Sequence, residues 1–209
     1  LVLGGNEGDD EVQTLVVADG FQAEKGGDVD DAQAAHFHKA AAHFRGAGHQ
    51  FSHTWEMEGH GLDWEPPLSH GFKVGIGTVA SCAMWEIFLK KSVEDFDIEK
   101  ALAAVKSPEQ IESEVRGALA PRMQEEAVKH SLKKRTEGDE LVARIELLKK
   151  VWPELKERCE AQLITAQDAM DRLKAVGAPY HPEMIDIDWD RFRETHFKAQ
   201  MIRDRYTVL

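Results

Sequence analysis

The chain has 209 residues and a formal net charge of −12, with ordinary shares of apolar and charged side chains. This length suits one or two domains with a real hydrophobic core. The acidic balance argues against a nucleic-acid partner, because most of the surface would repel a phosphate backbone. The two cysteines, Cys82 and Cys159, form no metal or disulfide motif, which favours a reducing, cytoplasmic setting.

Residues 1–45 differ in character from the rest of the chain. They hold acidic clusters ("NEGDDE", "GGDVDD") and an alanine- and histidine-rich piece, "DAQAAHFHKAAAHF", without sustained periodicity. We expect this segment to pack poorly, either as poorly ordered chain or as a weak helix after a loose loop.

Residues 46–73 concentrate histidine, tryptophan, proline and glycine. On a helix, His49 and His53 would share one face, and His70 follows in "SHGFKVGIG". We expect Gly46 and Gly48 to let the backbone turn just before His49.

Neutral imidazole binds zinc, nickel and iron well, but H-x-x-x-H is common by chance and differs from the H-E-x-x-H of zinc proteases. Two interpretations therefore stay open on the spacing alone. Either a pair of these histidines binds a metal, or all are surface or hydrogen-bonded core residues. His60 is expected to be an exposed loop residue, and Lys73 a surface lysine rather than a phosphate contact.

From residue 74 onward the pattern is helical. "GIGTVASCAMWEIFLKK" (75–91) is apolar nearly all round and predicts a buried helix. No apolar stretch is expected to reach the roughly 20 residues needed to cross a bilayer, so no membrane insertion is expected. Asp97 can cap a short helix through Val105, and Ser107, Pro108 and Gln110 form a capping-box pattern.

The remaining predicted helices are also bounded by capping and helix-ending residues. Asp139 is a candidate N-cap for residues 140–163, in which Pro153 should kink or restart the helix. Thr165 can cap 166–176, which Gly177 should end, and Asp188 can cap the last helix. The fold class predicted is mainly α, with at least about two-thirds helix and no sheet of three strands over residues 74–209.

Four stretches carry a resemblance to a known family: "GAGHQFSHTWEM" (46–57), "SHGFKVGIGT" (69–78), "GAPYHPEMIDID" (177–188) and "IRDRYTVL" (202–209). Together they resemble the sn-glycerol-1-phosphate dehydrogenases, in the superfamily of iron-containing alcohol dehydrogenases and dehydroquinate synthase-like enzymes. The resemblance spans residues 46–209, which it identifies as a helical metal- and substrate-binding domain.

The resemblance implies an enzyme that transfers hydride between NAD(P)H and dihydroxyacetone phosphate, a phosphorylated triose. It implies a divalent metal (zinc, nickel or iron) bound by one aspartate and two histidines, and it places these histidines at His49 and His70. It places a substrate contact at His53. His60 and the upstream histidines, His36, His38 and His43, are expected to be bystanders. A homo-oligomer is left open.

The chain also departs from this family. Neither the aspartate ligand nor a dinucleotide-binding domain is recognisable before His49, so the chain by itself is expected to be inactive. The family has Pro-Thr-Ser-Gly where this chain has "AHFRG". One codon choice for that sequence, read one base later, gives Pro-Thr-Ser-Gly, which suggests that residues 1–45 are an out-of-frame translation. Two alternatives remain: a non-catalytic helical protein with a relic metal motif, and another polyol or alcohol dehydrogenase.

Overall fold

A computed structural model describes residues 46–205 and 207–209. About 70% of these residues are helical and none lies in a strand, which confirms the predicted mainly α class. The predicted poor packing of residues 1–45, and the suggestion that they are an out-of-frame translation, concern residues outside the described part of the chain.

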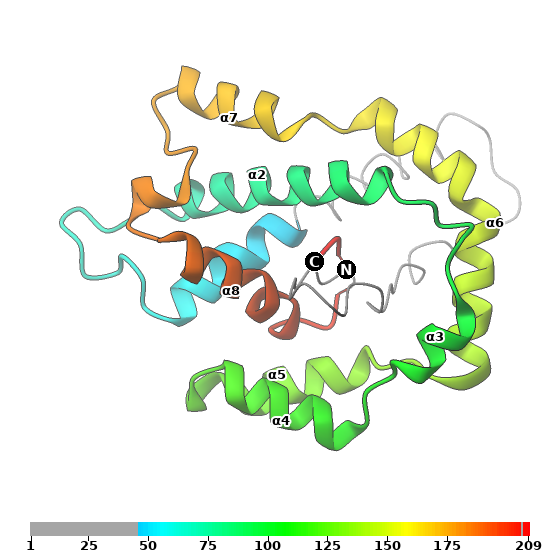
Figure 1. The fold of residues 1–209 in the computed structure, drawn as a ribbon. Coiled ribbons are helices and arrows are strands. Elements are labelled where there is room, and N and C mark those ends of the chain that lie inside the picture. The colour runs from blue at the N-terminus through cyan, green and yellow to red at the C-terminus, as the bar shows by residue number, and fades with distance from the viewer. Residues whose placement is uncertain (1–45, 206) are drawn as a thin grey trace, which may run out of the picture.

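The described chain opens with an antiparallel helical hairpin. Residues 46–57 are helical, a loop follows over 58–69, and α2 spans His70–Leu89. Helix α2 therefore begins five residues earlier than expected, so that His70 is its first residue. Figure 1 shows α2 crossing the middle of the molecule with the 46–57 helix alongside it.

Helix α2 is a core element. It packs against α7 (Ala166–Ala175), and its buried face includes Ile76, Ala80 and Phe88. The expectation that no segment is long and apolar enough to cross a membrane is wrong by length and composition, because α2 meets both conditions. Half of its most apolar window is buried within the fold, and a core helix passes the same test.

Three helices follow, and the first two begin at predicted caps. Asp97 caps α3 (Ile98–Ala103), and Ser107 and Gln110 form the expected capping box at the start of α4 (Pro108–Ala118). Helix α5 (Pro121–Lys133) packs against α4 as a hairpin, at the bottom of Figure 1. A small apolar cluster joins this hairpin to the end of α8.

Helix α6 (Gly138–Gln162) runs along one side of the molecule and leads to α7. Its N-cap is Glu137, and Gly138 adopts a left-handed φ of 54°, so the prediction of Asp139 as N-cap is wrong by two residues. The helix continues through Pro153 and changes direction along its course in Figure 1. Proline removes one helical hydrogen bond but does not end this helix.

The predicted boundaries of α7 are confirmed. Thr165 and Asp168 form a capping box, and the amides of Gly177 and Ala178 donate to the carbonyls of Lys174 and Leu173. These two bonds make a Schellman ending, which needs the left-handed φ of 68° that Gly177 supplies.

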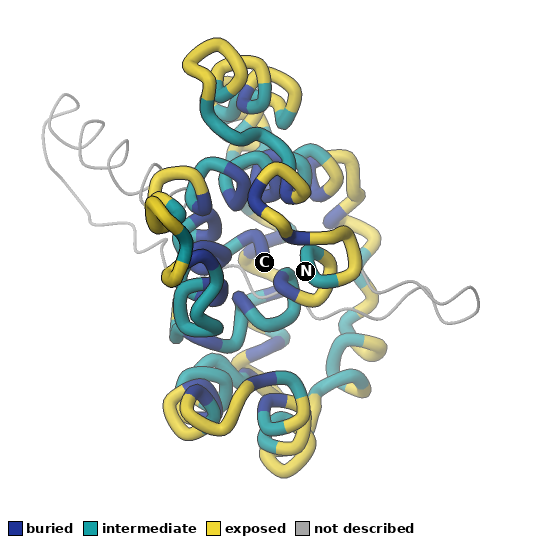
Figure 2. The backbone as a smooth tube through the Cα atoms, turned by 90° about the vertical axis from the view of Figure 1, so that its left-hand side faces the viewer, coloured by how far each residue is buried: buried dark blue, intermediate teal, exposed yellow. Residues whose placement is uncertain are grey.

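The chain ends with a 3₁₀ turn, η1 (Pro182–Ile185), and α8 (Trp189–Met201), which Asp188 caps as predicted. The main core lies where the 46–57 helix, α2, η1, α8 and the last residues meet. Its members include Phe51, Trp55 and Leu209. Figure 2 shows this buried interior, with exposed chain on the outlying helices.

Candidate metal and substrate site

Two glycines set the distance between the helices that carry the histidines. A Cβ atom added to Gly77 would lie 2.6 Å from the carbonyl oxygen of Gly48, and one added to Gly48 would lie 2.8 Å from Oγ1 of Thr78. The two helix backbones therefore touch at this point. The expectation that Gly46 and Gly48 make a turn is wrong, because both lie within the helix, where Gly48 permits close packing.

This close packing brings three imidazoles together. The ring centroids are 5.5 Å apart for His49 and His70, 5.7 Å for His53 and His70, and 6.1 Å for His49 and His53. His49 and His53 come from one face of the 46–57 helix, and His70 comes from the start of α2. The predicted convergence of His49 and His70, with His53 beside them, is confirmed.

A carboxylate lies on the inner side of this cluster. Oε1 of Glu56 is 2.7 Å from Nδ1 of His70, and Oε2 is 3.5 Å from Nδ1 of His53. The hydroxyl of Ser52 donates to Oε1 of Glu56 over 3.3 Å and lies 3.0 Å from Nδ1 of His70. Glu56 follows His49 by seven residues and His53 by three, so the same helix face supplies all three side chains.

Lys73, on α2, is the last member of this network. Its Nζ lies 3.3 Å from Oε1 of Glu56, and the residue is only 1% exposed. The prediction of a surface lysine is therefore wrong. Lys73 lies one helical turn after His70, on the face of α2 that meets the 46–57 helix, and the contact between the helices covers its stem.

The network shifts the ionisation of two of its members. Burial alone would raise the pKa of Glu56, but hydrogen bonds from His70 and Lys73 outweigh it and hold that pKa below its ordinary value. Burial lowers the pKa of His53, and the positive charge of Arg203 adds to the effect. At neutral pH the site thus contains an ionised carboxylate and a neutral His53 imidazole.

His60 lies apart from the cluster and has a structural role. Its Nε2 donates to the carbonyl of Ile185 over 2.7 Å, and Arg191 donates to its Nδ1 over 2.9 Å. His60 is half-buried, so the expectation of an exposed loop residue is wrong. It joins the 58–69 loop to η1 and α8. The other predicted bystanders, His36, His38 and His43, lie outside the described residues.

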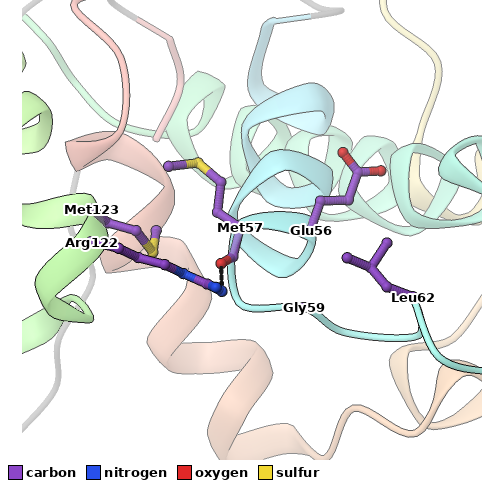
Figure 3. A pocket seen from close by; sticks show the side chains of 6 residues that line it. All are labelled: Glu56, Met57, Gly59, Leu62, Arg122 and Met123. Atoms are coloured by element: carbon purple, nitrogen blue, oxygen red, sulfur yellow. Dashed lines mark hydrogen bonds between the residues drawn. The ribbon is translucent and has the colours of Figure 1, made fainter.

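A shallow hollow of about 310 Å³ lies beside the network, between the end of the 46–57 helix and α5. It is lined by Glu56, Met57, Gly59, Leu62, Arg122 and Met123. Figure 3 shows Arg122 reaching across to the backbone carbonyl of Met57, to which it donates a hydrogen bond, while the carboxylate of Glu56 points away from both. Among the described residues that line the hollow, Glu56 is the one that also contacts the histidine cluster.

The separation of the two rings assigned as ligands, His49 and His70, can be compared with that of two imidazoles on one ion. Two imidazoles bound to one tetrahedral zinc at about 2.0–2.1 Å have ring centres about 5 Å apart, near the 5.5 Å between His49 and His70. Within the described part of the chain, no three or more His, Cys, Asp or Glu side chains are arranged to hold an ion together. The spacing of His49 and His70 thus matches that of two imidazoles on one ion, while the described residues show no complete set of three ligands.

Sequence reasoning found the three histidines but missed their partners, Ser52, Glu56 and Lys73. Helical spacing could have identified Glu56, because a residue seven positions after His49 and three after His53 lies on the same helix face. The burial of Lys73 had no such signal, because it arises from contact between two helices.

Comparison with known proteins adds no family assignment: no protein-family model, no curated protein and no solved structure matches the chain.

Proposed function

We propose that residues 46–209 form the metal- and substrate-binding domain of an NAD(P)-dependent sn-glycerol-1-phosphate dehydrogenase. The observation that supports this most is the convergence of His49, His53 and His70 from two helices, at the positions that the family motif assigns to the site. In this proposal His49 and His70 bind a divalent metal (zinc, nickel or iron), and His53 contacts the substrate.

The surroundings of these residues suit that role. Imidazoles coordinate such ions in their neutral form, and burial favours the neutral form of His53. When bound, the metal would polarise the ketone of dihydroxyacetone phosphate, and NAD(P)H would supply the hydride. The chain's own contribution is to hold two imidazoles on one side of the substrate and a third beside it.

Titration of the purified chain with zinc and nickel tests the ligand assignment. We expect weak binding, because two neutral ligands offer no charge compensation, and a further loss of at least about tenfold in His49→Ala and in His70→Ala. His130→Ala, a histidine change on α5, is the matched control and should bind as the unmodified chain does. Zinc affinity that neither cluster variant lowers would contradict the proposal.

The substrate class needs its own test. With zinc or nickel present, we expect sn-glycerol 1-phosphate to bind more tightly than glycerol, and this preference to fall in His53→Ala. Turnover of NAD(P)H with dihydroxyacetone phosphate would add direct support for the dehydrogenase. Equal binding of phosphorylated and unphosphorylated polyols would favour another polyol dehydrogenase. Metal binding with no polyol binding would favour a non-catalytic protein with a relic motif.

A further inference from the structure

The network beneath the histidines contains a carboxylate whose hydrogen bonds account for the orientation of one imidazole. Glu56 Oε1 lies 2.7 Å from Nδ1 of His70, the shortest contact in the network. An ionised carboxylate can only accept hydrogen bonds, so Nδ1 of His70 must carry the proton. The proton of a neutral ring then cannot be on Nε2, which is left with a free lone pair.

Glu56 is itself held in place. Lys73 Nζ lies 3.3 Å from the same Oε1, and Ser52 donates to it over 3.3 Å. Lys73 is 1% exposed, so Glu56 is the charged partner of an ammonium group that has almost no contact with water. A buried charge that lost its partner would be strongly unfavourable, which keeps the carboxylate ionised and in contact with Lys73.

We propose that Glu56 is a positioning residue: anchored by Lys73, it fixes His70 as the Nδ1-protonated tautomer and turns Nε2 toward a ligand shared with His49. Carboxylates in this relation to metal-binding histidines set the tautomer, the ring orientation and the basicity of the ligand. The inference rests on the proposed function for the identity of that ligand. The tautomer itself is a property of the metal-free chain.

The first measurement is ¹⁵N NMR of the imidazole rings in the metal-free chain at about pH 8. We expect His70 to be protonated on Nδ1. In Glu56→Ala we expect a shift to a mixture with Nε2 protonated. Glu58→Gln is the matched control, because Glu58 pairs with Arg191 and Lys198 and does not contact His70. It should leave the His70 tautomer unchanged.

The second measurement is zinc affinity of the same variants. We expect a loss of about 10- to 100-fold in Glu56→Ala and no change in Glu58→Gln. If Glu56→Ala does not fold, Glu56→Gln serves instead. The glutamine amide can donate to Nδ1, so it is expected to shift the tautomer in the same direction.

The outcomes separate the two proposals. A His70 tautomer that depends on Glu56 in a chain that binds no zinc would support the positioning role and contradict the proposed function. Zinc binding that needs His70, with tautomer and affinity unchanged in the Glu56 variants, would overturn the positioning role alone. Loss of zinc binding in Glu56→Ala without a change of tautomer would also overturn it, since Glu56 would then be a ligand.

Discussion

A lysine with almost no exposed surface lies beside the three histidines and shares one carboxylate oxygen with His70. Such a group is stable only with a well-placed partner, because removing one member of a buried ion pair typically destabilises a protein by about 3–5 kcal/mol. The Lys73–Glu56 pair therefore ties the geometry of the histidine cluster to the packing of α2 on the 46–57 helix.

A second lysine gives a prediction about pH. Burial lowers the pKa of Lys134 from 10.5 to about 8, and its ammonium donates to the carbonyl of Gln200 on α8. Between about pH 8 and 10.5 the native state has released a proton that the unfolded state keeps, so the free energy of unfolding should rise with pH. Lys134→Met should remove this rise.

Urea unfolding at a series of pH values from 7 to 10.5 checks that prediction. Lys150→Met, which removes an exposed lysine from α6, should keep the slope. The same slope in Lys134→Met and the unmodified chain would show that Lys134 does not lose its proton in this window.

At the scale of elements, the contact between the 46–57 helix and α2 depends on Gly77. A methyl group there would lie 2.6 Å from a backbone oxygen and 2.8 Å from Cβ of Phe51, and neither atom can move freely. We expect Gly77→Ala to destabilise the fold by about 1–3 kcal/mol through overpacking. Because the helices would separate, it should also weaken any metal binding by His49 and His70.

The matched control for that change is Gly117→Ala on α4, where an added Cβ atom meets nothing within 4 Å. Its effect should have the opposite sign, a gain of about 0.5–1 kcal/mol from better helix propensity. Thermal unfolding followed by circular dichroism measures both variants. An unchanged or increased stability in Gly77→Ala would show that the two helices are not held in backbone contact.

The helix boundaries that the sequence predicted correctly are those set by interactions between residues close together in the chain. The caps at Asp97, Ser107, Thr165 and Asp188 depend on residues three positions apart, so they are legible without tertiary information. The start of α2 was misplaced because its N-cap, Ser69, makes no side-chain capping bond. Asp139 looked like a cap but lies inside the first turn, after a left-handed glycine.

At the scale of the whole molecule, the convergence of His49, His53 and His70 was predictable from the motif, whereas its supports were not. Glu56 and Lys73 come from different helices, and their ion pair exists only once those helices are packed. In the described fold, the helices are thus set by interactions between nearby residues. The site, in contrast, depends on the packing of the 46–57 helix against α2.

Zinc K-edge X-ray absorption of the zinc-loaded chain tests the central claim most directly, because it reports the ligands of the ion itself. We predict imidazole nitrogens at about 2.0–2.1 Å, from His49 and His70, with water or other oxygen ligands in the remaining positions. His70→Ala should lose one imidazole contribution, and His130→Ala should lose none. A spectrum without imidazole scattering, or one that both His49→Ala and His70→Ala leave unchanged, would contradict the account.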